Sequence, residues 1–107
     1  MFIQLNTDNQ IKSDAEANAR LEEAVRERLA RFAQRLTHVE IHVSDLNGPK
    51  GGTGDKRVSL EARPTGHAPV AVHAEGARVD DAVLNAAGKA ARTLERLFGR
   101  LTDRKGH

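Results

Sequence analysis

The spacing of apolar residues along this 107-residue chain switches from helical to alternating and back, and that switch constrains the fold more than any other feature. In residues 14–36 the large apolar side chains recur three or four positions apart, the spacing of an amphipathic helix: Leu21, Val25, Leu29, Phe32 and Leu36. From residue 38 the period is two, and from Val79 it is helical again. The chain therefore mixes strands and helices in a fixed order.

Four short segments alternate between apolar and polar residues, which predicts strands at residues 2–6, 38–44, 57–63 and 70–74. A single helix links the first two strands, so we expect them to be parallel and joined by a right-handed crossover. The later links are short and predict an antiparallel meander. Each strand has one apolar face, so both helices should cover the same side. The predicted fold class is α+β, with order β-α-β-β-β-α: a four-stranded mixed sheet and two helices packed on one face.

The length predicts one domain, residues 1–101, followed by a polar tail, residues 102–107, that we expect to be frayed. The absence of Cys excludes a disulfide framework and a thiolate metal site. The apolar stretch at the N-terminus is too short for a signal peptide, and no run is long enough to span a membrane. We expect a soluble, cytoplasmic protein with no membrane partner.

No pattern in the chain predicts catalysis or a cofactor. The Gly-rich segment 48–54 lacks the Gly-Lys-Ser/Thr ending of a phosphate-binding loop, since Lys56 follows Asp55 and a strand comes next. His38 and His42 lie roughly 13 Å apart on a strand and cannot share a metal ion. Sequence alone also provides no nucleophile paired with a base. We therefore predict no enzyme activity, no cofactor, no metal site and no small-molecule substrate.

Basic residues follow one flank of each predicted helix. The net charge is only +2, from 17 Lys and Arg against 15 Asp and Glu, yet at about 100° per residue the cations fall beside both apolar stripes. The candidate RNA-binding residues are Arg20, Arg28, Arg31 and Arg35 on the first helix and Arg78, Lys89, Arg92, Arg96 and Arg100 on the last. Ion pairing within each helix is the alternative interpretation. Two one-sided stripes on adjacent helices favour a polyanion that offsets their repulsion.

The aromatic content narrows the expected contact with nucleic acid. The chain has no Trp or Tyr and three Phe, of which Phe32 and Phe98 fall at predicted core positions. Stacking of bases needs exposed rings, and we expect none. Recognition should instead use phosphates and the shape of structured RNA or DNA.

The chain combines this order of strands and helices with two sequences: Thr-His-Val-Glu-Ile-His-Val at residues 37–43, and Val-His-Ala-Glu-Gly at 72–76 before an Ala-rich basic helix. Over residues 1–100 these features resemble the ribosome hibernation-promoting factor and ribosome-associated inhibitor family. The resemblance implies a short-form translation inhibitor, without the extra C-terminal domain of long members. It implies that the protein binds the small ribosomal subunit and its ribosomal RNA in the decoding channel. On this chain the contact roles would fall to Arg28, Arg31, Arg35, Lys89, Arg92 and Arg96.

Two alternatives remain open from the sequence. Helix, three strands and helix also make up a double-stranded-RNA-binding domain. A protein-interaction module using the polar sheet face or an edge strand is a different class of function. The oligomeric state is open as well.

Overall fold

The computed structural model describes residues 1–8, 14–45 and 56–106, and only the backbone of residues 100–106. The elements in chain order are β1 (Phe2–Thr7), α1 (Ala15–Arg28), the 3₁₀ helix η1 (Ala30–Arg35), β2 (Leu36–Asp45), β3 (Lys56–Pro64), β4 (Val70–Gly76) and α2 (Val79–Gly106). The predicted α+β class and the β-α-β-β-β-α order are confirmed. The predicted inter-strand loop at 47–55, with Lys50, and the turn residues 9–13 lie outside the described residues.

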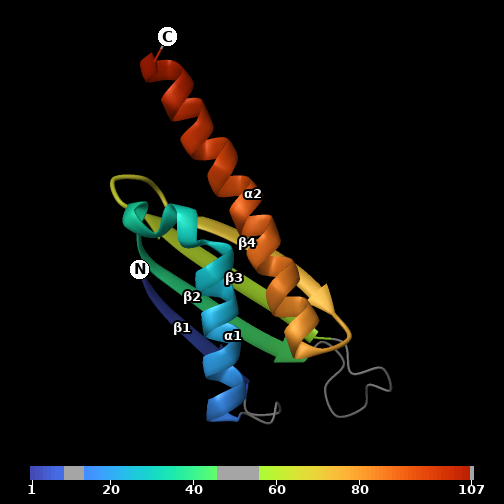
Figure 1. Ribbon diagram of the computed structural model, residues 1–107. Helices are drawn as coiled ribbons and strands as arrows, with labels where there is room; N and C mark the ends of the chain where they lie inside the picture. The colour runs from blue at the N-terminus through green and yellow to red at the C-terminus, as the bar shows by residue number, and fades with distance from the viewer. Residues whose placement is uncertain (9–13, 46–55, 107) are drawn as a thin grey trace.

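The four strands form one sheet in the order β1-β2-β3-β4. β1 is parallel to β2, with Ile3 opposite Val39, and the other two pairs are antiparallel. Both helices cover the same face and run in the same direction across it, while the other face is uncovered (Figure 1). The topology agrees with the sequence prediction. Within the ranges described, none of the helices has the length and apolar content needed to cross a membrane.

The core lies between the helices and the apolar face of the sheet. Val39, Ile41 and Leu60 from the strands are at most 1 % exposed, and burial of each such side chain contributes about 1.5–3 kcal/mol. The buried face of α2 consists mainly of Ala, with Val83 and Leu94 among the larger side chains. Small side chains allow α2 to lie close against the sheet. No polar or charged residue is buried among those described.

The prediction of one continuous helix over residues 14–36 is wrong in its last third. Asp14 caps α1, since its carboxylate accepts a hydrogen bond of 3.0 Å from the amide of Glu16. The α-helix ends at Arg28, η1 follows, and Leu36 pairs with Pro64 as the first residue of β2. A spacing of three between Leu29 and Phe32 fits a 3₁₀ turn as well as an α-helix, and both side chains are buried in this conformation.

The free edge of β1 is covered by side chains from α1. Glu22 accepts a hydrogen bond of 3.0 Å from the amide of Leu5, and Arg26 donates one of 3.0 Å to the carbonyl oxygen of Met1. Glu22 and Arg26 are four residues apart and therefore project from the same side of the helix. They occupy backbone groups that an incoming strand would otherwise use.

Candidate nucleic-acid interface

Acidic and basic residues occupy different stretches along each helix, as well as different sides of it. Residues 14–25 contain four acidic residues and one Arg, whereas residues 26–35 contain four Arg and one Glu. Residues 78–88 contain two Asp and one Arg, and residues 89–98 contain three cations and one Glu. Because α1 and α2 run in the same direction (Figure 1), the basic segment 26–35 lies beside the basic segment 89–98, in the middle of α2. Acids in the first turn of each helix, and Arg26 and Arg28 in the last turn of α1, also complement the helix dipoles.

Arg28 of α1 and Arg92 of α2 converge on Gly88. A Cβ atom at Gly88 would lie 3.6 Å from one terminal nitrogen of each guanidinium. Within the part of the chain that the structure describes, neither Arg has an ion pair with a carboxylate. Two guanidinium groups that flank one small gap can donate to a single anion placed there. Arg28 and Arg92 are therefore the candidate anion contacts between the two helices.

Arg31 and Arg35 lie against aromatic rings that join η1 to α2. The guanidinium of Arg31 is 4.8 Å from the ring centre of Phe32 and forms an ion pair of 3.3 Å with Glu95. That of Arg35 is 4.6 Å from the ring centre of Phe98, and the two rings are 5.7 Å apart. Each cation–ring contact contributes about 0.5–1 kcal/mol, and the exposed ion pair about 0.2–1 kcal/mol. Both cations are held at the surface, but the charge of Arg31 is partly offset by Glu95.

Lys89 lies at the sheet edge rather than between the helices. Its ammonium group donates a hydrogen bond of 2.7 Å to the carbonyl oxygen of His73, and Asn85 donates one of 3.1 Å to the carbonyl oxygen of Glu75. Both carbonyl groups belong to β4, which is the outer strand on this side. Lys89 therefore covers an edge strand, as Arg26 does on the other side of the sheet.

The remaining predicted cations differ in where they lie relative to Arg28 and Arg92. Arg20 lies in the acidic half of α1, 4.0 Å from Glu16, with a side chain 72 % exposed. Arg78 directly precedes α2, beside its acidic first turn. Arg96 is exposed one turn beyond Arg92. Arg100 falls within α2, and its side chain lies outside the described residues.

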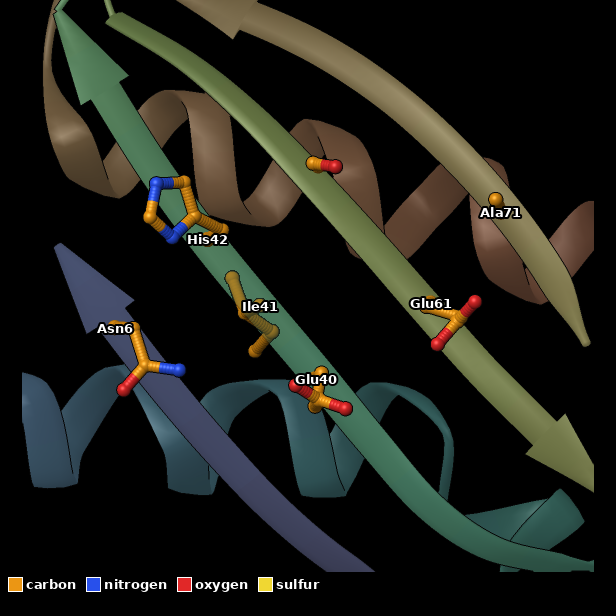
Figure 2. A pocket seen from close by; sticks show the side chains of 7 residues that line it. Asn6, Glu40, Ile41, His42, Glu61 and Ala71 are labelled. Atoms are coloured by element: carbon orange, nitrogen blue, oxygen red, sulfur yellow. The ribbon is translucent and has the colours of Figure 1, made fainter. Parts of the chain in front are cut away.

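A shallow hollow of about 290 Å³ lies on the uncovered face of the sheet (Figure 2). Its lining comes from all four strands: Asn6, Glu40, Ile41, His42, Ser59, Glu61 and Ala71. No group of three or more potential metal ligands occurs among the residues that the structure describes. The hollow is far from the basic helix segments because it is on the opposite face of the sheet.

A family model described as Sigma 54 modulation protein / S30EA ribosomal protein matches residues 10–102. The chain belongs to this family. The resemblance predicted from the sequence is thereby confirmed. The S30EA family is a family of ribosome modulation factors and not of enzymes, in agreement with the sequence prediction.

Two solved structures share the fold of this S30EA-family chain. A ribosomal subunit interface protein from Coxiella burnetii has a TM-score of 0.67 and 18 % identity, and the match covers 92 % of this chain and 99 % of that one. The N-terminal domain of Protein Y from Thermus thermophilus has a TM-score of 0.62 and 21 % identity, with 91 % and 99 % covered. At these identities the likeness shows the fold. No curated protein matches the chain.

One surface residue of this S30EA-family chain contradicts the sequence prediction. Phe2 is 59 % exposed, so the expectation that no aromatic ring would be exposed is wrong. Its ring lies 5.3 Å from that of His38 on the neighbouring strand. The alternation of β1 indicates this position, because Ile3 and Leu5 are buried and Phe2 must point the other way. Phe32 and Phe98 are buried as predicted.

Proposed function

We propose that this protein represses translation as a cytoplasmic ribosome-associated factor that binds structured ribosomal RNA in the decoding channel of the small subunit. The binding surface consists of the basic segments 26–35 of α1–η1 and 89–98 of α2. Membership of the S30EA family supports association with the ribosome, as does the likeness to a protein named for the ribosomal subunit interface. The segregation of charge along the two helices supports RNA as the component contacted.

The convergence of Arg28 and Arg92 on Gly88 carries the proposal. Like charges held close together without a carboxylate partner repel each other, and this destabilises the free protein. A phosphate oxygen between them removes that repulsion and accepts hydrogen bonds from both guanidinium groups. A glycine at this point leaves the gap open, since any larger residue would place its side chain there.

The surrounding cations extend the interface along the RNA backbone. Arg31, Arg35 and Arg96 are exposed in the same two basic segments, and the rings of Phe32 and Phe98 fix the direction of the first two. Phosphate contacts of this kind position a protein on a folded RNA without reading its bases. Lys89, Arg20, Arg78 and Arg100 complete the proposed set, with a smaller contribution because of where their helices place them.

The proposal is tested by sedimentation of tagged protein with a stationary-phase lysate through sucrose gradients at low and high salt. The wild-type protein should migrate with small-subunit and whole-ribosome fractions at low salt and be released at high salt. The double variant Arg28→Glu/Arg92→Glu should lose this association. The matched control is Arg57→Glu/Arg63→Glu, which changes the net charge by the same amount on the uncovered face of the sheet and should retain it.

A quantitative version uses binding of purified protein to small subunits over a range of salt concentrations. Replacement of Arg28 and Arg92 by Gln should lower the slope of log affinity against log salt by roughly two, because each guanidinium group neutralises about one phosphate charge. Circular dichroism of every variant confirms that folding is retained. Equal weakening in the control variant would contradict the assignment of the site, and no association of the wild-type protein would contradict the function.

A further inference from the structure

Two carboxylates of the uncovered sheet face are held opposite each other. Glu40 of β2 and Glu61 of β3 are direct cross-strand partners, and both side chains project from the side away from the helices (Figure 2). Like charges in directly opposite positions destabilise a sheet. Their contacts come from the adjacent row of the sheet: the guanidinium of Arg63 lies 2.9 Å from Glu61, and the imidazole of His38 lies 3.5 Å from Glu40. A cation between the two carboxylates would remove the repulsion.

A shallow hollow lies beside this pair. The hollow measures about 290 Å³, just below the range of about 300–1,000 Å³ that small-molecule pockets occupy. On the β4 side the hollow is lined by the small side chain of Ala71, and Asn6 and Ser59 provide further polar groups. Such a hollow accepts the end of a Lys or Arg side chain, with its charge between the carboxylates.

An exposed aromatic ring lies on the same face. Phe2 is the cross-strand partner of His38, so it is in the row next to Glu40. An aromatic face near a carboxylate suits a guanidinium, which can stack on the ring and donate hydrogen bonds to the acid. The edges of the sheet are less available, because α1 covers backbone groups of β1 and α2 covers those of β4. A partner therefore meets the face through side chains and not by adding a strand.

We propose that the uncovered sheet face docks a basic segment of a protein, with an Arg or Lys side chain seated between Glu40 and Glu61 and a second cationic side chain against Phe2. Among the outward residues of β2, β3 and β4 the acids Glu40, Glu61 and Glu75 outnumber Arg57 and Arg63, and this balance favours a cationic polypeptide over a nucleic acid backbone. The surface lies opposite the basic helix segments, so RNA and the basic partner segment bind at the same time. This inference goes beyond the proposed RNA-binding function and does not depend on it.

The test is a nuclear magnetic resonance titration of the full-length ¹⁵N-labelled chain at about 0.15 M salt, where exposed charges more than a Debye length apart are largely screened. The probe is a synthetic peptide of alternating Gly and Arg, and an RNA hairpin is titrated separately. The peptide should shift the amide signals around Glu40, Glu61 and Phe2. The variant Glu40→Gln/Glu61→Gln should weaken peptide binding roughly tenfold or more, because two charge-assisted hydrogen bonds become neutral.

The matched control is Glu75→Gln. Glu75 is on the same face but opposite Arg57, so its removal breaks an attraction instead of a repulsion. It should leave peptide affinity unchanged.

Three results would overturn the inference. In the first, the peptide shifts the amide signals of the acidic half of α1 instead of those of the sheet. In the second, the double variant binds the peptide as tightly as the wild-type protein does. In the third, the RNA hairpin shifts the amide signals of Phe2 and Glu40. If the double variant does not fold, the positions of the amide signals that the peptide shifts in the wild-type chain decide whether the inference holds. If the RNA hairpin does not shift the amide signals around Arg28 and Arg92, only the proposed function is contradicted. The two hypotheses therefore fail separately.

Discussion

Gly88 offers the sharpest test of how the helices form the RNA site. It lies buried within α2, where glycine is less favourable than alanine by about 0.5–1 kcal/mol. A Cβ atom there meets Arg28 and Arg92 at 3.6 Å, which is ordinary van der Waals contact and requires no backbone shift. Gly88→Ala should therefore raise the free energy of unfolding by about 0.5–1 kcal/mol.

For a domain of this size a change of 1 kcal/mol corresponds to about 4–8 °C in the unfolding midpoint, which circular dichroism resolves easily. The control is Gly99→Ala, also in α2, where a Cβ atom has no described neighbour within 4 Å. Both variants gain helix propensity. Only Gly88→Ala places a methyl group in the gap between the two guanidinium groups, so only this variant should bind small ribosomal subunits more weakly.

The two measurements separate the parts of the reasoning. A less stable Gly88→Ala variant would show that the interface between the helices is tighter than the distances indicate. A more stable variant that binds ribosomal subunits as well as Gly99→Ala does would show that no phosphate occupies the gap. Greater stability with weaker binding is the expected pair of results.

Three further predictions concern packing and the sheet edge. Gly76→Ala places a Cβ atom 2.8 Å from the backbone nitrogen of Ala82 and should lower the free energy of unfolding in urea by about 1–3 kcal/mol. Asn85→Ala/Lys89→Ala removes two hydrogen bonds to β4, at about 0.5–1.5 kcal/mol each, and should increase self-association measured by light scattering; an unchanged molecular mass would contradict the covering role. Phe98→Ala should lower stability by about 3–5 kcal/mol in the same urea assay, and a decrease below 1 kcal/mol would show that this buried ring contributes little.

The strands were predictable because one face is buried along each of them. A period of two fixes which side chains point inward, and a shift of one residue would expose the whole apolar set. Val39, Ile41 and Val43 all have 0 % exposure, as the alternation requires. The end of α1 was not predictable in this way, since residues 28–30 contain no Gly or Pro and the break depends on Leu36 joining the sheet.

The candidate site was predictable in composition but not in arrangement. Helical projection identified the cations, yet it treated Arg31 and Arg35 as part of an α-helix, and they lie in η1. Projection also says nothing about how far one helix is displaced along its neighbour, which is what brings Arg28 to Arg92. The position of Lys89 at the carbonyl group of His73 depends on where β4 lies under α2, and the sequence of α2 does not contain that information.

The parallel course of α1 and α2 has a consequence for how the protein meets its target. With acidic residues in the first part of both helices and cations in residues 26–35 and 89–98, the described part of the molecule has an electric dipole directed along the helix axes. A large polyanion exerts a torque on such a molecule and turns its basic segments forward before contact. A greater share of encounters then begins in a productive orientation, and association becomes faster at low ionic strength without any change in the contacts finally made.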